Sequence, residues 1–318
     1  RPWDMVELCK HPNLTMSFVE EFPNGISGQP WRMDLLSSYL NMTIEFLEKY
    51  PKGLAGIGWC IDELMFNTSI SISDLIRILP NMDPQYKLNM FRISSHPELT
   101  LDLIREFRDG ILGNLWNIPY LSRNVNLTLD FLEEFPDGIS GCGWDMYGIT
   151  SNPCMTLQFI RNHPNGLGDR KWNIHSLSLS RILTVDFIKD YPDGFCGQNW
   201  DIDVISQNTN LSLDFIKEFP DGISGKPWNM ISLSSNSAIT IKFLREFPDG
   251  ITGRPWQVSF LTRNISFSSE WIEEFPDGLC DQEWDISWIV KHSSLPLSFI
   301  EKYPQGIHGH RWGLDMIS

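Results

Sequence analysis

The chain has 318 residues, of which 42% are apolar, and a formal net charge of −15 at pH 7. No apolar run approaches the roughly 18 residues that a membrane-spanning helix needs. The acidic balance excludes a general nucleic-acid binder, because neutralising phosphates requires clustered Lys and Arg. We therefore expect a soluble protein that neither inserts into a membrane nor binds nucleic acid through its charge.

Tryptophan divides the chain into repeats of 28 residues. Repeats this short cannot bury their own apolar side chains, so they must stack on their neighbours. The sequence predicts an all-α solenoid of about eleven helix-turn-helix repeats forming a curved elongated rod, with residues 1–318 as a single continuous array. The repeats start at Trp3, Trp31, Trp59, Leu88, Trp116, Trp144, Trp172, Trp200, Trp228, Trp256 and Trp284, with a partial repeat from Trp312.

The first helix of each repeat is expected to begin just after the tryptophan. Asp or Asn stands there in most repeats, and these side chains accept hydrogen bonds from unpaired helical N–H groups. The residues two and five positions after the tryptophan are apolar in every repeat, as Met33 and Leu36 are. Because three residues are about one helical turn, both lie on one face, which predicts that this face packs in the core.

The second helix is expected to begin at a hydroxyl residue such as Thr128. Leu127, directly before that cap, is placed to pack on Leu132 as a hydrophobic staple. Phe131, Leu132 and Phe135 then mark the buried face at helical spacing. The same cap position is held by Thr15, Thr43, Thr100, Thr156, Thr184, Ser212, Thr240 and Ser268.

Proline and glycine mark the end of the second helix. Pro136 follows Phe135, and proline forces the residue before it out of α geometry. Asp137-Gly138 supplies the positive φ of a tight turn toward the next tryptophan. The sequence therefore predicts that proline ends the helix and that glycine turns the chain.

The third and fourth repeats depart from this pattern together. Met82 stands where glycine is expected, Leu88 replaces tryptophan, and Arg108 replaces proline. One additional residue is placed between Trp59 and Asp74. Tolerated drift within a long array is the favoured interpretation, and a hinge or a partner contact is the alternative.

Three recurrent patterns carry a resemblance to a known group. They are the Trp-Asp/Asn start, the Leu-Ser-x-Asn step, and the Asn-Leu-Thr-x-x-Phe-Ile-x-x-Phe/Tyr-Pro-Asp run, and residues 205–216 show the last two best. The array resembles the Trp-rich short α-helical repeat proteins encoded by giant DNA viruses of amoebae (mimivirus-like). The resemblance implies a viral or host-interaction protein, located in the virion or the host cytoplasm, and it transfers no catalytic residue.

Residues fixed by the repeat serve packing, so we seek recognition at the positions that the repeat leaves free. On the first helix these lie three, four and seven residues after the tryptophan. Large apolar side chains and Arg on an outward face are typical anchors of a protein-binding surface, and contact between adjacent repeats is the alternative. The candidates are Phe91, Arg92, Tyr120, Arg123, Tyr147, His175, Leu179, Ile231, Phe260, Arg263 and Trp288.

Catalytic and metal-binding patterns are missing from the sequence. It contains no GxxxxGK[ST], HExxH, GxSxG or GxGxxG motif, so we expect no enzyme and no cofactor. His308 and His310 supply at most half of a metal site, and we expect none. The six cysteines form no CxxC pair, which favours reduced thiols in an intracellular protein that is not secreted.

Three functions follow as hypotheses. The leading one is a non-enzymatic scaffold for protein–protein interaction, with the variable first-helix face as its recognition surface. The second is an architectural virion subunit that assembles end to end through its uncapped terminal repeats. The third is ligand or nucleic-acid binding along the tryptophan ladder, which requires accessible indole rings.

Overall fold

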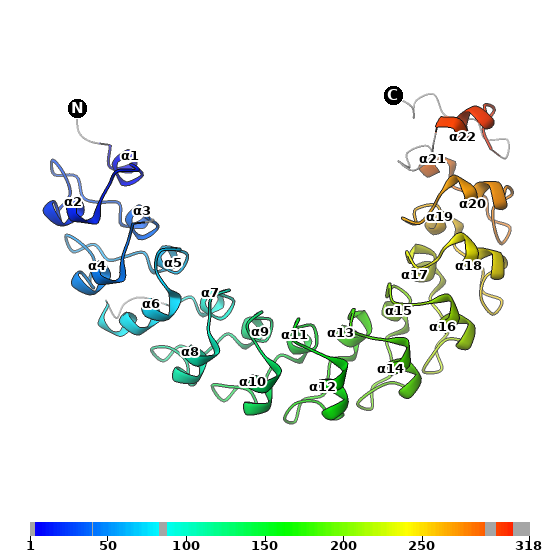
Figure 1. The fold of residues 1–318 in the computed structure, drawn as a ribbon, viewed down its shortest axis with the longest axis horizontal. Coiled ribbons are helices and arrows are strands. Elements are labelled where there is room, and N and C mark those ends of the chain that lie inside the picture. Colours follow the sequence, from blue (N-terminus) through cyan, green and yellow to red (C-terminus); the bar gives the residue numbers. More distant parts are fainter. Residues whose placement is uncertain (1–3, 40, 83–87, 290–296, 308–318) are drawn as a thin grey trace. The chain divides into compact units, whose positions relative to one another are not determined.

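The computed structural model describes residues 4–39, 41–82, 88–289 and 297–307. Trp3 and Trp312, the predicted starts of the first and the last, partial repeat, lie outside the described residues. Within them the chain forms 22 short α-helices and one 3-10 helix, without a β-strand (Figure 1). The predicted all-α fold of short helices is confirmed.

Two kinds of helix alternate along the chain. The first helices follow the tryptophan positions: α1 (Met5–Cys9), α3 (Met33–Ser37), α5 (Ile61–Leu64), α7 (Met90–Ser94), α9 (Ile118–Leu121), α11 (Met146–Thr150), α13 (Ile174–Leu179), α15 (Ile202–Ile205), α17 (Met230–Ser235), α19 (Val258–Leu261) and α21 (Ile286–Ile289). The second helices are α2 (Met16–Glu21), α4 (Ile44–Lys49), α6 (Ile72–Ile78), α8 (Leu101–Glu106), α10 (Leu129–Glu134), α12 (Leu157–Asn162), α14 (Val185–Asp190), α16 (Leu213–Glu218), α18 (Ile241–Glu246), α20 (Ser269–Glu274) and α22 (Leu297–Lys302). The 3-10 helix η1 (Leu79–Asn81) follows α6.

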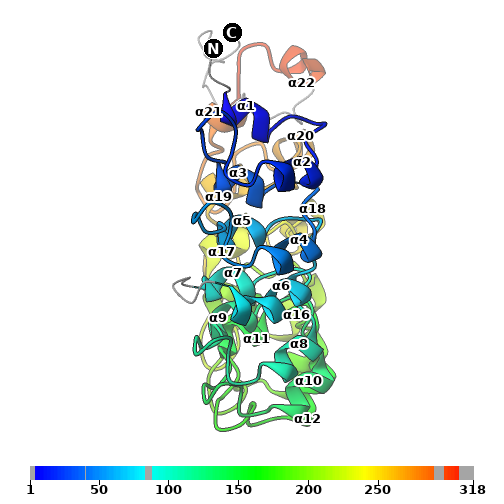
Figure 2. The same ribbon diagram turned by 90° about the vertical axis from the view of Figure 1, so that its left-hand side faces the viewer.

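Contacts divide the chain into an N-terminal half, residues 1–155 with 167–170, and a C-terminal half, residues 156–166 with 171–318. In the N-terminal half the first helices form one layer and the second helices lie beside them as another (Figures 1 and 2). Successive first helices contact one another, as α1, α3 and α5 do in the N-terminal half and α13 and α15 do in the C-terminal half. Each half is therefore a two-layer stack of helix pairs.

The predicted caps open most helices. The Asn229 side chain accepts a hydrogen bond from Ser232 N at the start of α17, and Thr128 accepts one from Phe131 N at the start of α10. Thr240 and Ser268 occupy the predicted cap positions of α18 and α20 without a side-chain cap bond. The ψ angles at these two positions are 168° and 167°, against 160° at Thr128.

The tryptophan side chains are core residues, as predicted. Trp228 is only 2% exposed, and its ring meets Phe215 of α16 edge to face, with centroids 5.8 Å apart. Its indole Nε1 donates to the carbonyl oxygen of Phe219 at 2.7 Å. The indoles at 31, 59, 116, 144, 172, 200, 256 and 284 make the same bond to the residue nine positions earlier. The ladder thus fills the core and also pairs the carbonyl at the end of each of these second helices.

A two-residue hairpin turn precedes the tryptophan, which the sequence did not predict. Ile223 and Lys226 exchange backbone hydrogen bonds of 3.1 and 2.9 Å across Ser224 and Gly225. Both turn residues have positive φ, 53° and 67°, which is the type I′ geometry. The preceding Gly222 has no alternative, because a Cβ there would lie 1.9 Å from the Lys226 carbonyl oxygen.

Buried asparagines join six of the described repeats to the repeat before them. The side-chain amide of Asn236 donates to the carbonyl oxygens of Ser206 and Asn208, at 2.9 and 3.0 Å, and its Oδ1 accepts from Ala238 N. Equivalent bonds are made by Asn67, Asn124, Asn152, Asn208 and Asn264. The buried hydroxyl of Ser206 in turn accepts from Asn229 N of the following repeat. The Leu-Ser-x-Asn step therefore connects repeats in both directions.

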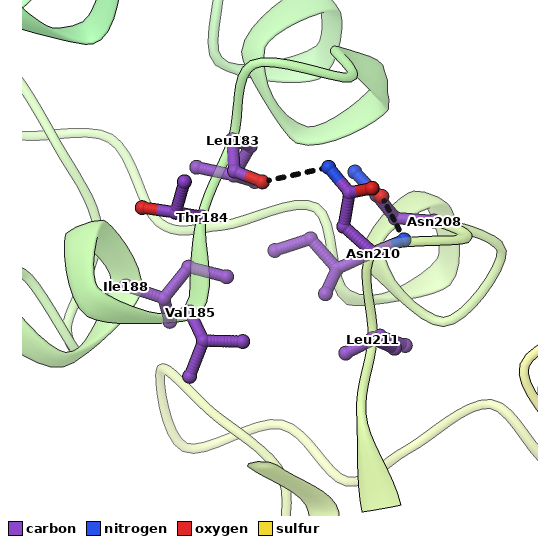
Figure 3. A pocket seen from close by; sticks show the side chains of 8 residues that line it. Leu183, Thr184, Val185, Ile188, Asn208, Asn210 and Leu211 are labelled. Atoms are coloured by element: carbon purple, nitrogen blue, oxygen red, sulfur yellow. Dashed lines mark hydrogen bonds between the residues drawn. The ribbon is translucent and has the colours of Figure 1, made fainter.

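The seam between repeats is closely packed. In Figure 3, Asn210 donates to the Leu183 carbonyl oxygen at 3.2 Å, above an apolar gap lined by Val185, Ile188 and Leu211. The cavity volume is about 10 Å³, which is the space of at most one water molecule. This seam cannot hold a ligand.

The structure narrows the position of the additional residue in the third repeat. Ile72, the first residue of α6, lies 13 positions after Trp59, as Ile44 of α4 does after Trp31, so nothing is inserted before α6. At the other end of the helix, the Leu79 N–H bonds to the Leu75 carbonyl oxygen as the Tyr50 N–H does to that of Phe46. Leu75 lies 16 positions after Trp59 and Phe46 lies 15 after Trp31, so the additional residue lies between Ile72 and Leu75. This position lies within the predicted interval between Trp59 and Asp74, and the insertion lengthens the helix, since α6 has seven residues and α4 has six.

Candidate partner-binding surface

The predicted recognition positions of the N-terminal half lie on exposed parts of successive first helices. Phe91 on α7 is 43% exposed, Tyr120 on α9 is 38% exposed, and Tyr147 on α11 is 43% exposed. Arg92 is half-buried on α7, and Arg123 is exposed just beyond α9. The first-helix backbone places these side chains outward, because the residue five positions after the tryptophan position is buried in α7, α9 and α11, and the residue two positions after it is buried in α9 and α11.

These side chains contact one another from repeat to repeat. The Phe91 and Tyr120 rings meet edge to face, with centroids 4.1 Å apart. The Arg123 guanidinium lies over the Tyr147 ring at 5.4 Å from its centroid. Arg92 lies over the ring of Phe66 at 4.7 Å. We call Phe66, Phe91, Arg92, Tyr120, Arg123 and Tyr147 the aromatic stripe.

Phe66 is the member of the stripe that the sequence interpretation missed. It lies seven residues after Trp59, which is the same free position that Arg123 holds after Trp116. Its side chain is the most exposed of the four rings, at 56%. This shared position after the tryptophan is the sequence signal that identifies Phe66.

Each arginine of the stripe also faces a carboxylate. Arg123 Nη2 lies 3.0 Å from Asp145 Oδ2, and its Nη1 donates to the Pro119 carbonyl oxygen at 2.7 Å. Arg92 Nε lies 4.0 Å from Asp62 Oδ1. Exposed pairs of this kind add little stability. Their effect is to hold the guanidinium planes against the rings and to neutralise both arginines.

The candidates in the C-terminal half form smaller groups. Arg263 lies over the Trp288 ring at 4.9 Å and 3.6 Å from an Asp285 carboxylate oxygen. His175 Nδ1 lies 2.8 Å from Asp201 Oδ2. The remaining candidates are the exposed Leu179 and Ile231 and the half-buried Phe260.

The pKa of Asp201 reflects its mixed environment. Partial burial raises this pKa, but hydrogen bonds from His175 and from Val204 N favour the charged carboxylate more strongly. The pKa of Asp201 is therefore held below its usual range.

Ile231 also borders an open groove with a volume of about 420 Å³. Asp203, Asn229 and Arg254 provide its polar groups, and Asn229 Nδ2 donates to Asp203 Oδ1 at 2.7 Å. The polar groups on this side of the groove thus bond to each other.

The second helices carry a different surface. Their charged side chains were expected to form a solvated face, and they are exposed, but they also pair between neighbouring repeats. Arg105 donates to both carboxylate oxygens of Glu134. Similar pairs join Lys49 to Glu20, Arg77 to Glu106, Arg161 to Asp190, Lys189 to Glu218, Lys217 to Glu246 and Arg245 to Glu274. The charged side chains of this face therefore form ion pairs between neighbouring repeats.

The potential metal ligands and the free thiols of the described residues are dispersed. No three His, Cys, Asp or Glu side chains among them are placed as ligands of one ion, and His308 and His310 lie outside the described range. Burial raises the pKa of the Cys9, Cys154, Cys196 and Cys280 thiols, which keeps them protonated at neutral pH. None of the described helices is long and apolar enough to span a bilayer.

Comparison of the chain with known proteins found no matching family model, no matching curated protein and no matching solved structure.

Proposed function

We propose that this protein is a non-enzymatic repeat scaffold that binds a protein partner through its first-helix face, with the aromatic stripe as the main contact. The observation that carries the proposal is the continuity of the stripe. Six side chains from four successive repeats touch in pairs on an exposed face, while the tryptophans of the same helical layer are buried.

Composition supports a protein partner. Tyr, Trp and Arg are the residues that most often dominate the binding energy of protein interfaces. Rings that lie against neighbouring side chains lose little conformational entropy when they bind, because their rotamers are already restricted. Both features are present at Tyr120 and Arg123, which are held by Phe91 and by Asp145.

The tryptophan ladder is left out of the proposed site. Its nine described indoles are at most 3% exposed, so they offer no open face on which a base or sugar could stack. For the biological setting, the resemblance to giant-virus repeats supports a role in a virus particle or in an infected cell.

Affinity purification with matched variants tests this proposal. The Phe91→Ala/Tyr120→Ala double variant removes two rings of the stripe, and the Leu112→Ala/Val125→Ala double variant removes two exposed apolar side chains from loops of the same half. We expect a partner that co-purifies with the wild-type chain and with the loop variant to be lost from the stripe variant. Circular dichroism checks that both variants stay helical. Equal recovery of every bound protein by both variants would remove the stripe from consideration.

A further inference from the structure

The stripe has more hydrogen-bond donors than free acceptors. Its donors are two guanidinium groups, each with five N–H bonds, and the Tyr120 and Tyr147 hydroxyls. Its nearby acceptors, Asp62 and Asp145, already face Arg92 and Arg123. Arg123 Nη1 also donates a hydrogen bond to the Pro119 carbonyl oxygen, and the other N–H groups of this guanidinium remain available to a ligand. A complementary ligand therefore offers many acceptors and few donors.

The charges of the stripe also restrict its ligand. Asp62 and Asp145 balance the two arginines, so the stripe together with these two aspartates presents no net charge. The chain as a whole carries −15, which repels an acidic segment at long range. Since Arg92 and Arg123 are already paired with Asp62 and Asp145, a charged side chain of the ligand finds no unpaired opposite charge on this surface, and a segment with few charged side chains suits it best.

The spacing of the repeats selects the conformation of the ligand. Packed helices lie about 8–10 Å apart. A polyproline II helix has three residues per turn and rises about 3.1 Å per residue, so it presents the same side every 9.3 Å or so. Two residues of a β-strand span only about 6.6–6.8 Å. A polyproline II segment along the row of first helices can therefore place an equivalent residue against each successive repeat.

Proline-rich chains combine many hydrogen-bond acceptors and few donors, few charged side chains, and the polyproline II conformation. Proline has no N–H, and the polyproline II backbone has no internal hydrogen bonds, so its carbonyl oxygens remain available to the Arg and Tyr donors. The proline rings are apolar and pack on aromatic side chains, as in other grooves that recognise such segments.

We infer that the aromatic stripe binds an uncharged, proline-rich segment of a partner protein in the polyproline II conformation, with a proline at every third residue lying against successive repeats from Phe66 to Tyr147. The inference rests on the proposed function and specifies the partner of the same surface. Phe66, the contacting pair of Phe91 and Tyr120, and Tyr147 provide the apolar surfaces that contact the prolines. Arg92, Arg123 and the two tyrosine hydroxyls bind the carbonyl oxygens.

Fluorescence anisotropy with the full chain and synthetic peptides tests this inference. The probe is a labelled, uncharged peptide of about twelve residues with proline at every third position. A peptide of the same composition with its prolines at irregular positions is the matched control. We expect the regular peptide to bind, and the irregular one to bind about tenfold more weakly, because its prolines cannot all face the stripe. An acidic peptide and an amphipathic helical peptide are the competing occupants.

Variants locate the site on the chain. Tyr120→Ala is expected to weaken binding of the regular peptide about tenfold, as loss of a central ring does. Arg123→Lys is expected to weaken it as well, because a lysine keeps the charge but loses the planar stacking on Tyr147. Val125→Ala, an exposed apolar position outside the stripe, should bind like wild type.

Several results would overturn the inference: no binding of the regular peptide, equal binding of the regular and irregular peptides, or tighter binding of the acidic or the helical peptide. The proposed function is judged separately. If the Phe91→Ala/Tyr120→Ala variant loses a co-purifying partner while the regular peptide fails to bind, the stripe remains the partner surface and only the proline-rich segment is excluded.

Discussion

The indole Nε1 of Trp116 donates to the carbonyl oxygen of Phe107 at 2.8 Å, and α8 ends at Glu106 although Arg108 stands where proline is expected. The preceding repeat has the opposite combination. The third repeat keeps Pro80, but the residue that follows it at the next tryptophan position is Leu88, and there α6 continues into the 3-10 helix Leu79–Asn81. The two repeats together indicate that the indole bond, more than the proline, fixes the end of the second helix.

Removing the indole donor should therefore lower the free energy of unfolding by more than restoring the proline raises it. Trp116→Phe leaves the Phe107 carbonyl oxygen without its partner and opens a gap in the core, and we expect a loss of about 2–4 kcal/mol in the free energy of unfolding. Arg108→Pro should change that free energy by less than about 1 kcal/mol. Urea unfolding followed by circular dichroism measures both. A larger effect of Arg108→Pro would show that proline controls the helix end.

The buried asparagines should matter more than the exposed ones. Asn236→Ala removes the partner of two carbonyl oxygens in the preceding repeat, and we expect a loss of about 2–4 kcal/mol. Asn210→Ala also removes two such bonds, but this residue is exposed, so water can replace the amide. Its cost should be smaller by about 1 kcal/mol or more. Equal losses in the two variants, measured by urea unfolding, would contradict a role of burial.

His96 stands at the asparagine position of the fourth repeat and replaces only part of the hydrogen bonding of the asparagine amide. Its Nδ1 accepts from Glu98 N, so Nε2 carries the proton and donates to the Met65 carbonyl oxygen at 3.0 Å. The buried asparagines donate to two carbonyl oxygens. We expect His96→Asn to stabilise the chain by about 0.5–1.5 kcal/mol, because the amide adds the second bond. A lower midpoint of thermal unfolding in this variant would show that the imidazole packing matters more.

The Asp201 carboxylate should make the C-terminal half sensitive to acid. Its pKa is below the ordinary value in the folded state, since hydrogen bonds from His175 and Val204 N outweigh the effect of burial. A carboxyl of this kind stabilises the fold above its unfolded pKa of about 3.9, and this contribution is lost as the pH falls through the lower folded pKa.

Asp201→Asn keeps an oxygen for the helix cap and removes the titration. Its melting temperature should therefore fall less steeply than that of wild type below about pH 4. His175→Ala, which removes one of the two hydrogen bonds, should give an intermediate slope. Identical slopes in all three proteins would exclude Asp201 as a source of acid sensitivity.

Much of the fold could be predicted from the sequence because its signals are local. The tryptophan period, the apolar pairs such as Met33 and Leu36, and caps such as Thr128 each depend on residues within one repeat. Helical periodicity and capping act over three to five residues, so a linear pattern is sufficient to locate them. The outward positions of Tyr120 and Arg123 followed from the same pattern, because they are the first-helix positions that the repeat does not keep apolar.

Only the tertiary structure shows which of these residues contact one another across repeats. The bond from Asn236 to Ser206, the edge-to-face contact of Phe91 with Tyr120, and the pairing of Phe66 with Arg92 all join different repeats. The sequence shows that such residues occupy free or recurring positions, but not which atoms meet. That depends on the packing of one layer against the next, because a hydrogen bond or a ring contact is made or lost within a fraction of an ångström.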